Sequence, residues 1–365
     1  MVAQTLHLNW HNPVAIRLQE GLIHQFQPHS PFVVLADPQA IDMGTEALLR
    51  RQWGHLCLQW VWQRERISSL SAAQSLAQDI WPALSSQGKV TLWAIGGGTT
   101  LDLGKLLRWR FSDTETAIVS WRNNTTTAAT QRHALWCTPT TSGTGSEVTP
   151  WATVWDHETT PACKRSWHPE KLGYAECAWL DPCLTLHCPV QITRDSGMDA
   201  LAHALESVWN HQANRLTRPV AVEAARLILS TLPEILRKPD DLILRTRMAH
   251  ASLLSGLAMS QTQTALAHAL SYRLTLEENM PHGQACAVWL PMTMELAANQ
   301  SSQVRHDLES IFCMPIEKCL VRMTQWLEAL GITPRDLRDS SDGRYVLEQA
   351  LRSPRGKNFI GALIA

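Results

Sequence analysis

Short apolar runs alternate with amphipathic helical patterns in the first half of the chain. Five of these runs are candidates for buried strands: residues 32–36, 56–62, 90–95, 117–120 and 134–137. Between two of them, residues 71–84 carry apolar positions at helical spacing. Strands separated by helices favour a parallel sheet with helices on both faces.

The pattern changes after Asp181 and Pro182, where strand-like runs become rare. Apolar residues recur at helical spacing in four long segments: residues 195–209, 219–236, 242–260 and 304–330. The chain has 365 residues, a length that favours two domains. We therefore predict a Rossmann-like α/β domain over residues 1–185 and an all-helical domain over residues 186–365.

The composition argues against nucleic-acid and membrane partners. The formal net charge is −1 and no basic stretch stands out, so no surface for nucleic acid is expected. No apolar run approaches the ~18 residues that span a bilayer, and the first residues lack the pattern of a signal peptide. The nine cysteines form no Cys-x-x-Cys pair, which favours free thiols over a disulfide framework. We therefore expect a cytoplasmic protein.

A carboxylate and an imidazole lie four residues apart at Asp199 and His203. On a helix this spacing puts both side chains on one face, where they can bind one divalent cation. His268 and His282 follow later in the chain and can complete the coordination shell. One Asp and three His suit a catalytic Fe(II), Zn(II) or Mn(II) better than a structural thiolate zinc site.

A glycine-rich stretch, residues 96–105 (Gly-Gly-Gly-Thr-Thr-Leu-Asp-Leu-Gly-Lys), follows a predicted strand and enters a predicted helix. Glycines let backbone N–H groups approach a phosphate, and the start of the helix adds a favourable dipole. The stretch is not the Gly-x-Gly-x-x-Gly fingerprint, and a triple glycine is also common in tight turns.

A second candidate ligand loop, residues 138–147, gathers hydroxyls and glycines behind another predicted strand. Such a loop can bind a polar ligand through hydroxyl and backbone donors, or it can be a surface loop with Glu147 in a helix cap. Asp37 ends an early strand. It either accepts hydrogen bonds from an adenosine ribose, which favours NAD over NADP, or forms a turn before Pro38.

Together these residues resemble the iron-dependent (group III) alcohol dehydrogenase family, over most of the chain. The matching motifs are residues 96–105, 138–147, 197–206, His268 and residues 281–283. The resemblance implies the two-domain architecture shared with dehydroquinate synthase, a homodimer, an Fe(II) ion, with Zn or Mn as alternatives, and NAD(H), with NADP(H) as the alternative. It makes Asp199, His203, His268 and His282 the metal ligands. It makes the cofactor contacts Gly97, Gly98, Thr99, Asp102, Thr138, Thr141, Ser142, Thr144 and Lys164.

Two segments resemble one branch of this family, the phosphonoacetaldehyde reductases: residues 147–156 and 267–275. Tyr272 stands where many family members carry a histidine linked to proton transfer. It is either a hydrogen-bond donor to the substrate or a positioning residue, because a phenol with a pKa near ~10 is a poor base. Arg273 stands where the branch usually has proline, and it is our first candidate for binding an anionic group.

The resemblance predicts reduction of a small anionic aldehyde to its primary alcohol, with phosphonoacetaldehyde to 2-hydroxyethylphosphonate as the first candidate. Sulfoacetaldehyde reduction to isethionate and a broad-range alcohol dehydrogenase are the alternatives within the family. A dehydroquinate-synthase-like lyase and a non-catalytic binding protein are alternatives from other classes. The loop at residues 138–147 and the Asp199–His203 pair argue against the lyase, and the retention of all four metal-ligand candidates argues against the non-catalytic protein.

Overall fold

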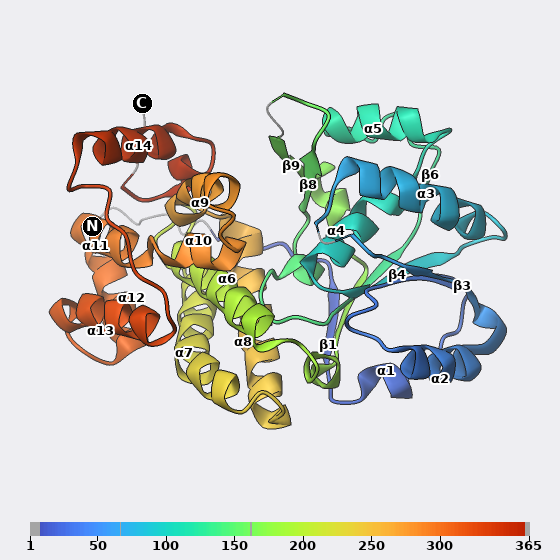
Figure 1. The fold of residues 1–365 in the computed structure, drawn as a ribbon, viewed down its shortest axis with the longest axis horizontal. Coiled ribbons are helices and arrows are strands. Elements are labelled where there is room, and N and C mark those ends of the chain that lie inside the picture. Colours follow the sequence, from blue (N-terminus) through green and yellow to red (C-terminus); the bar gives the residue numbers. More distant parts are fainter. Residues whose placement is uncertain (1–7, 66, 161–162, 362–365) are drawn as a thin grey trace. The chain divides into compact units, whose positions relative to one another are not determined.

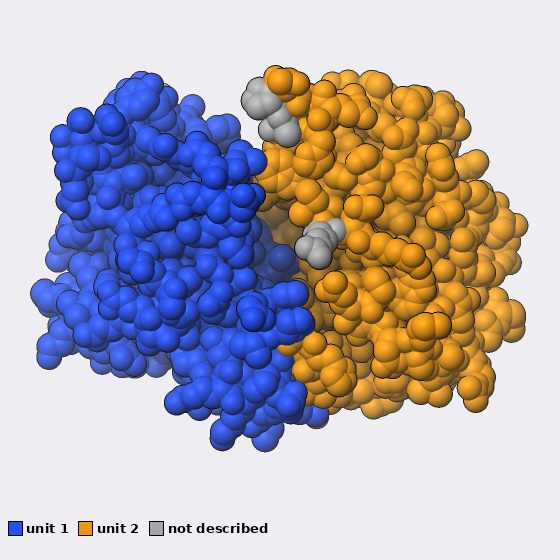
Figure 2. All heavy atoms as spheres, in the orientation of Figure 1, with its two compact units in different colours: residues 1–11, 142–145, 189–365 blue, residues 12–141, 146–188 orange. Residues whose placement is uncertain are grey.

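The computed structural model describes residues 8–65, 67–160 and 163–361. The chain forms two compact units, which Figure 2 shows in different colours. The sheet unit consists of Asn12–Thr141 and Ser146–Cys188. The helical unit consists, within the described residues, of residues 189–361, Ser142–Gly145 and residues 8–11. The predicted domains 1–185 and 186–365 stay a prediction, because compactness alone does not show which segments fold independently.

The sheet unit is built on a six-stranded parallel sheet with strand order β1-β10-β7-β4-β2-β3. Figure 1 labels β1, β3 and β4 of this sheet. Its strands are β1 (Ala15–Leu18), β2 (Phe32–Ala36), β3 (Cys57–Trp62), β4 (Thr91–Gly96), β7 (Leu135–Pro139) and β10 (Cys177–Leu180). Four of the five predicted strands therefore exist. A parallel α/β sheet is confirmed as the fold of this part of the chain.

Side chains of the central strands alternate between two apolar cores, one on each face of the sheet. Val33 and Leu35 of β2 join a core with the neighbouring helices, whereas Phe32 and Val34 face a second core. This second core is rich in tryptophan, and Trp93 is fully buried in it. Burial of both faces explains why the strands are continuous apolar runs.

The helices of the sheet unit include one that the sequence pattern misassigned. They are α1 (Leu22–Gln25), α2 (Met43–Trp53), α3 (Leu70–Leu84), α4 (Gly98–Leu107) and α5 (Thr114–Arg122). The strand predicted at residues 117–120 was wrong, because these residues lie inside α5. Asp113 caps this helix by accepting a hydrogen bond from Thr116 N, and a four-residue apolar run cannot by itself distinguish a strand from a buried turn of helix.

The pattern also missed the strands that have no buried apolar run. Residues of β1 are mostly exposed, and β10 alternates between partly buried and buried positions. The sequence pattern also missed two small antiparallel pairs of strands. The two strands of one pair have only two residues each. In the other pair, one strand alternates between buried and half-buried residues and the other is mostly half-buried. These pairs are β5 (Trp109–Arg110) with β6 (Gln131–Arg132), and β8 (Ala152–Asp156) with β9 (Cys163–Trp167).

The helical unit has its own apolar core, contributed by most of its helices. They are α6 (Val190–Val208), α7 (Thr217–Arg237), α8 (Leu242–Thr262), α9 (Leu266–Glu277), α10 (His282–Ala287), α11 (Leu290–Gln300), α12 (Ser302–Phe312), α13 (Ile316–Ala329) and α14 (Ser341–Arg352). The predicted segment 304–330 is divided into α12 and α13, because Cys313 takes a left-handed conformation and Pro315 follows. Within the described residues, no helix has the length and apolar character needed to cross a membrane.

Candidate functional site

Four predicted metal ligands of the helical unit converge on one point. Helix α6 presents Asp199 and His203, while His268 comes from α9 and His282 begins α10. The Asp199 Oδ1 atom lies 3.6 Å from His203 Nε2, 3.4 Å from His268 Nε2 and 3.9 Å from His282 Nε2. Ligands bound tetrahedrally at roughly 2.0–2.2 Å are separated by about 3.3–3.6 Å, so these spacings fit one shared cation.

Asp199 Oδ1 and His268 Nε2 are among the buried atoms of this cluster that have no hydrogen-bond partner in the described protein. Asp199 is 6% exposed and His268 is 2% exposed. Leaving such buried atoms unsatisfied costs about 1–3 kcal/mol each. A cation bound between them would satisfy both atoms, and the donor set of one carboxylate and three imidazoles suits Fe(II), Zn(II) or Mn(II).

The electrostatics of the cluster favour the metal-binding forms of Asp199 and His203. Burial alone would raise the pKa of Asp199, but the neighbouring His203, His268 and His282 outweigh it and hold that pKa well below its ordinary value. Burial lowers the pKa of His203 to about 4, although Asp199 opposes this shift. At neutral pH the carboxyl is therefore ionised and the His203 imidazole is neutral, as metal ligation requires. Burial alone would lower the pKa of His268, but Cys286, Glu206 and Asp199 outweigh it and raise that pKa well above its ordinary value.

Glu206 is a functional candidate that the sequence reasoning did not assign. Its buried carboxylate accepts hydrogen bonds from Ala265 N and Ala267 N and lies 2.7 Å from His268 Nδ1. A carboxylate at Nδ1 fixes the imidazole so that Nε2 faces the metal position. The signal was present in the sequence, since residues 199, 203 and 206 form a polar stripe on an otherwise apolar helix face.

Gly283 explains the glycine of the Pro-His-Gly motif. A Cβ atom at this position would lie 1.8 Å from Asp195 O and 3.0 Å from Asp199 N. Only glycine therefore allows the start of α10 to approach α6 this closely. This approach sets His282 beside Asp199.

The predicted cofactor loops follow three adjacent strands of the sheet unit. In the sheet, β4 lies between β2 and β7, so the carboxyl ends of these strands share one edge. Asp37 follows β2, Gly97 and Gly98 follow β4, and Thr141 lies just beyond β7. Gly97 caps α4 without a side-chain hydrogen bond, and Thr99 lies half-buried in the first turn of that helix. This arrangement is typical of a site for the phosphates of a nucleotide.

Three predicted cofactor contacts, Thr138, Asp37 and Asp102, have side chains that form hydrogen bonds within the sheet unit. Thr138 is buried, and its hydroxyl accepts a hydrogen bond from Trp93 Nε1 at 2.9 Å. Asp37 Oδ1 accepts a hydrogen bond from Gln39 N at 2.9 Å, which is the turn that the sequence left open. Asp102 accepts from Ser146 Oγ at 2.6 Å and from Thr153 N at 2.8 Å.

Lys105 and Asp102 form a buried polar cluster beneath the glycine-rich loop. The Lys105 Nζ atom donates to Ser146 Oγ at 2.8 Å and to Trp151 O at 2.6 Å, and lies 3.8 Å from Asp102 Oδ1. Burial lowers the pKa of Lys105 and raises that of Asp102, and each group opposes the shift of the other. Lys164 of β9 interacts electrostatically with Asp102, so the structure brings it to this part of the sheet unit.

Ser142 and Thr144, the remaining predicted cofactor contacts, belong to the helical unit rather than to the sheet unit. Gly145, which follows them, has φ 61° and is so close to α8 that a Cβ atom would lie 2.5 Å from Gly256 Cα. The glycine thus permits both the left-handed backbone and the contact. The Thr-Ser-Gly-Thr-Gly segment therefore packs against α8 in addition to presenting hydroxyl groups.

Tyr272 and Arg273 have different surroundings, although they are neighbours in α9. Tyr272 lies one helical turn after His268, and the Arg355 guanidinium carbon lies 5.4 Å from the centroid of its ring. Arg273 instead donates to Glu277 at 2.8 Å, and 60% of its side chain is exposed. The structure therefore does not bring Arg273 into the metal cluster.

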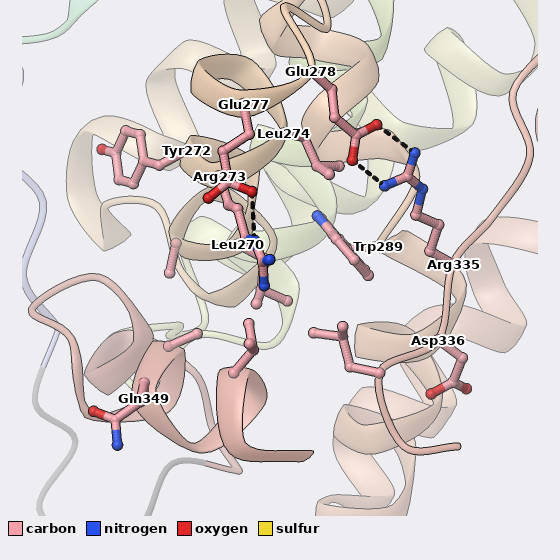
Figure 3. A pocket seen from close by; sticks show the side chains of 14 residues that line it. Leu270, Tyr272, Arg273, Leu274, Glu277, Glu278, Trp289, Arg335, Asp336 and Gln349 are labelled. Atoms are coloured by element: carbon pink, nitrogen blue, oxygen red, sulfur yellow. Dashed lines mark hydrogen bonds and ion pairs between the residues drawn. The ribbon is translucent and has the colours of Figure 1, made fainter. Parts of the chain in front are cut away.

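Arg273 lines a cavity of about 720 Å³ between α9 and the segment that leads into α14. Figure 3 shows its ion pair with Glu277, the pair of Arg335 with Glu278, and a Tyr272 side chain directed away from the Arg273 guanidinium. Each arginine of this cavity is already matched by a carboxylate. The cavity therefore offers no excess of positive charge for an anionic ligand.

Comparison with known proteins matches both halves of the chain to one family. The model of the iron-containing alcohol dehydrogenases matches residues 25–182, and the C-terminal model of the Fe-containing alcohol dehydrogenase family matches residues 193–339. The chain is 36% identical to the 1-propanol dehydrogenase PduQ of Salmonella typhimurium over 56% of its own length and 50% of that relative. It therefore spans about half the length of this relative.

Two further comparisons cover more of the chain. Long-chain-alcohol dehydrogenase 1 of Geobacillus thermodenitrificans is 32% identical over 74% of this chain and 69% of its own length. The sulfoacetaldehyde reductase of Bifidobacterium kashiwanohense, solved with NAD+, shares the fold with a TM-score of 0.84, covering 97% of this chain and 95% of that one at 22% identity. By its two family models and its 32% identity to the long-chain-alcohol dehydrogenase, the chain belongs to the iron-containing alcohol dehydrogenase family.

Proposed function

We propose that this protein is a metal-dependent, NAD(H)-linked reductase that interconverts a small anionic aldehyde and its primary alcohol. One observation carries the proposal: Asp199 Oδ1 lies within 3.9 Å of His203, His268 and His282 Nε2. Two unsatisfied buried atoms in this cluster and membership of the iron-containing alcohol dehydrogenase family support it.

In this proposal each unit holds one of the two groups that the reaction needs. Asp199, His203, His268 and His282 hold the metal, with iron favoured by the family. Gly97, Gly98 and the uncapped start of α4 hold the pyrophosphate of the cofactor. A carboxylate at Asp37 favours NAD(H), because it would repel the additional phosphate of NADP(H).

The proposed reaction transfers a hydride, which carries two electrons, to the aldehyde carbon and a proton to its oxygen. When bound, the metal supplies Lewis-acid polarisation of the substrate oxygen and the nicotinamide supplies the hydride. Burial raises the pKa of Tyr272 above its ordinary value, although Arg355 opposes this shift. Its phenol therefore stays protonated at neutral pH and donates a hydrogen bond rather than acting as a base.

In this proposal Arg355, and not Arg273, binds the anionic group of the substrate. Arg355 lies over the ring of Tyr272, and Tyr272 follows His268 by one turn of α9. Arg355 also donates a hydrogen bond to Thr264 Oγ1. A guanidinium held by a ring and a hydroxyl keeps its charge and several donors for a phosphonate or sulfonate. Arg273 lacks this role in the proposal because Glu277 already neutralises it.

We place phosphonoacetaldehyde first among the substrates, because residues 147–156 and 267–275 resemble the phosphonoacetaldehyde reductases. Sulfoacetaldehyde is the second candidate, and it is the substrate named for the reductase of Bifidobacterium kashiwanohense that shares this fold. The two substrates differ in charge, since a sulfonate carries one negative charge and a phosphonate carries between one and two near neutral pH.

The test is NADH oxidation by the Fe(II)-loaded protein with phosphonoacetaldehyde, sulfoacetaldehyde and propanal. We expect kcat/KM for phosphonoacetaldehyde to exceed that for propanal by about tenfold or more, which corresponds to roughly 1.4 kcal/mol. Arg355→Met should remove this preference and leave propanal turnover unchanged, whereas Arg273→Met should retain it. Equal turnover of all three aldehydes would leave only the dehydrogenase chemistry, and loss of the preference in Arg273→Met alone would restore Arg273 as the anion-binding residue.

A further inference from the structure

The metal cluster contains a thiol that neither the motif nor the resemblance identified. Cys286 lies four residues after His282 in α10, so the two side chains share one face of that helix. Cys286 Sγ lies within 4.8 Å of a ligand atom from each of Asp199, His268 and His282, and the same limit holds among all four atoms. Cys286 is fully buried.

This spacing is close to what a single metal ion imposes. Two ligands on opposite sides of one ion, with bonds of roughly 2.1 and 2.3 Å, are separated by about 4.4 Å. The four atoms lie within 4.8 Å of one another, so the sulfur is near enough to approach an ion shared with the other three atoms. Asp199 Oδ1 and His268 Nε2, both unsatisfied, belong to this same group of four.

The contacts of Cys286 differ from those of another buried thiol in the same unit. The Cys319 side chain donates to the carbonyl oxygens of Met314 and Pro315, each at 3.4 Å, which is the usual way for a helical thiol to be satisfied. Cys286 has no such carbonyl partner among the described residues and lies beside the imidazole of His268 instead. Its sulfur is therefore directed at a predicted metal ligand.

We propose that the Cys286 thiolate is a further ligand of the metal ion that Asp199, His203, His268 and His282 hold. This inference rests on the metal site of the proposed function and adds a residue to it. On metal binding the S–H bond breaks, a sulfur–metal bond forms and the proton passes to water. Thiolate is a soft ligand, so Cys286 biases the site toward Zn(II) or Co(II) and away from Mn(II).

The direct test is the absorption spectrum of the Co(II)-loaded protein. We expect the visible d–d bands of bound Co(II) and, in addition, a thiolate-to-Co(II) charge-transfer band in the near ultraviolet. Cys286→Ser should lose the charge-transfer band and keep the d–d bands, whereas Cys319→Ser should keep both. In a competition between Zn(II) and Mn(II), Cys286→Ser should lose about tenfold or more of the wild-type preference for Zn(II).

The possible outcomes separate this inference from the proposed function. Co(II) binding without the charge-transfer band, or a band that persists in Cys286→Ser, would overturn the role of Cys286 and leave the metal site intact. A protein that binds no Co(II) would overturn both. If Cys286→Ser does not fold, X-ray absorption on the Zn(II)-loaded wild type decides the question, because a ligated thiolate gives a sulfur shell at about 2.3 Å and an unligated thiol gives none.

Discussion

The two units each bury a cluster of polar side chains, and the clusters differ in whether their atoms are satisfied. In the sheet unit, Lys105 and Asp102 find partners in Ser146, Thr153 and the Trp151 carbonyl. In the helical unit, Asp199 and His268 are buried, and Asp199 Oδ1 and His268 Nε2 have no hydrogen-bond partner within the described protein. The first cluster is complete by itself, whereas in our proposal a bound cation completes the second.

This difference separates a structural polar cluster from a binding site. A satisfied buried pair such as Lys105 and Asp102 specifies how α4 packs on the segment around Ser146, and its loss should affect folding. A buried polar group without a hydrogen-bond partner lowers the stability of the fold, and a bound cation would offset this loss. Burial and charge alone do not distinguish the two clusters, since both contain groups with shifted pKa values.

We expect the largest difference between the clusters, in bound metal, when one carboxylate of each cluster is replaced by an amide. Asp199→Asn should reduce bound metal to trace levels and lower kcat/KM by more than about 100-fold. Substitutions of residues that only support a metal ligand typically cost up to about 100-fold, so the loss of a ligand should cost more. Asp102→Asn should retain a full complement of metal and lose stability instead. Metal analysis of both purified variants decides this, and a metal-replete Asp199→Asn protein would remove the contrast between the clusters.

Removing the cation of the satisfied cluster should give the largest loss of stability. Lys105→Met removes the nearest cation from the partly buried Asp102 carboxylate, so we expect a loss of up to about 3–5 kcal/mol in the free energy of unfolding. The exposed Lys89→Met is the matched control and should change it by less than about 0.5 kcal/mol. Urea denaturation measures both, and a loss below about 1 kcal/mol would show that this cluster is not structural.

A smaller effect on the metal cluster is expected when only the support of His268 is changed. Glu206→Gln removes the charge that faces His268 Nδ1, so metal affinity should fall by about 10–100-fold while the ion still binds. Glu223→Gln, at an exposed position of α7, should leave affinity unchanged. Competition with a chelator measures the affinity, and identical values for wild type and Glu206→Gln would exclude a supporting role.

The smallest effect concerns the pH dependence of the sheet unit. Burial raises the pKa of Glu147 to about 7, so this residue stabilises the fold while protonated, and its contribution is lost as the pH rises from about 4.5 through 7. Glu147→Gln should therefore match the wild type at pH 5 and gain about 2–4 °C in Tm at pH 8, equivalent to roughly 1 kcal/mol. Exposed Glu115→Gln should show no such difference, and a gain at pH 5 as large as that at pH 8 would contradict the assignment.

The sequence predicted the parts of the fold that carry strong periodicity. The buried strands β2, β4 and β7 and the long helices α6, α7 and α8 coincide with predicted segments because each buries a continuous or regularly spaced apolar face. The predicted strand at residues 117–120 failed because the Asp113 cap, and not the apolar run, decides its structure. Strand β1 was missed because an exposed edge strand has no apolar run to reveal it.

The candidate site was predictable to the extent that helical spacing or a motif marked it. Asp199 and His203 share a face by their spacing, and the structure adds His268 and His282 to the same point. Glu206 and Cys286 carried comparable spacing signals, but neither was assigned a role from the sequence, although Glu206 ends the motif at residues 197–206. Arg273 and Arg355 could not be distinguished from the sequence, because their partners, Glu277 and Tyr272, depend on how the side chains pack.

The central claim is that the Asp199 cluster is a metal centre, and X-ray diffraction at the iron absorption edge tests it most directly. Crystals of the Fe(II)-loaded protein should give one strong anomalous peak in the helical unit, within bonding distance of both Asp199 Oδ1 and His268 Nε2. An iron-loaded crystal with no peak at these atoms, or with its peak elsewhere on the chain, would contradict the account.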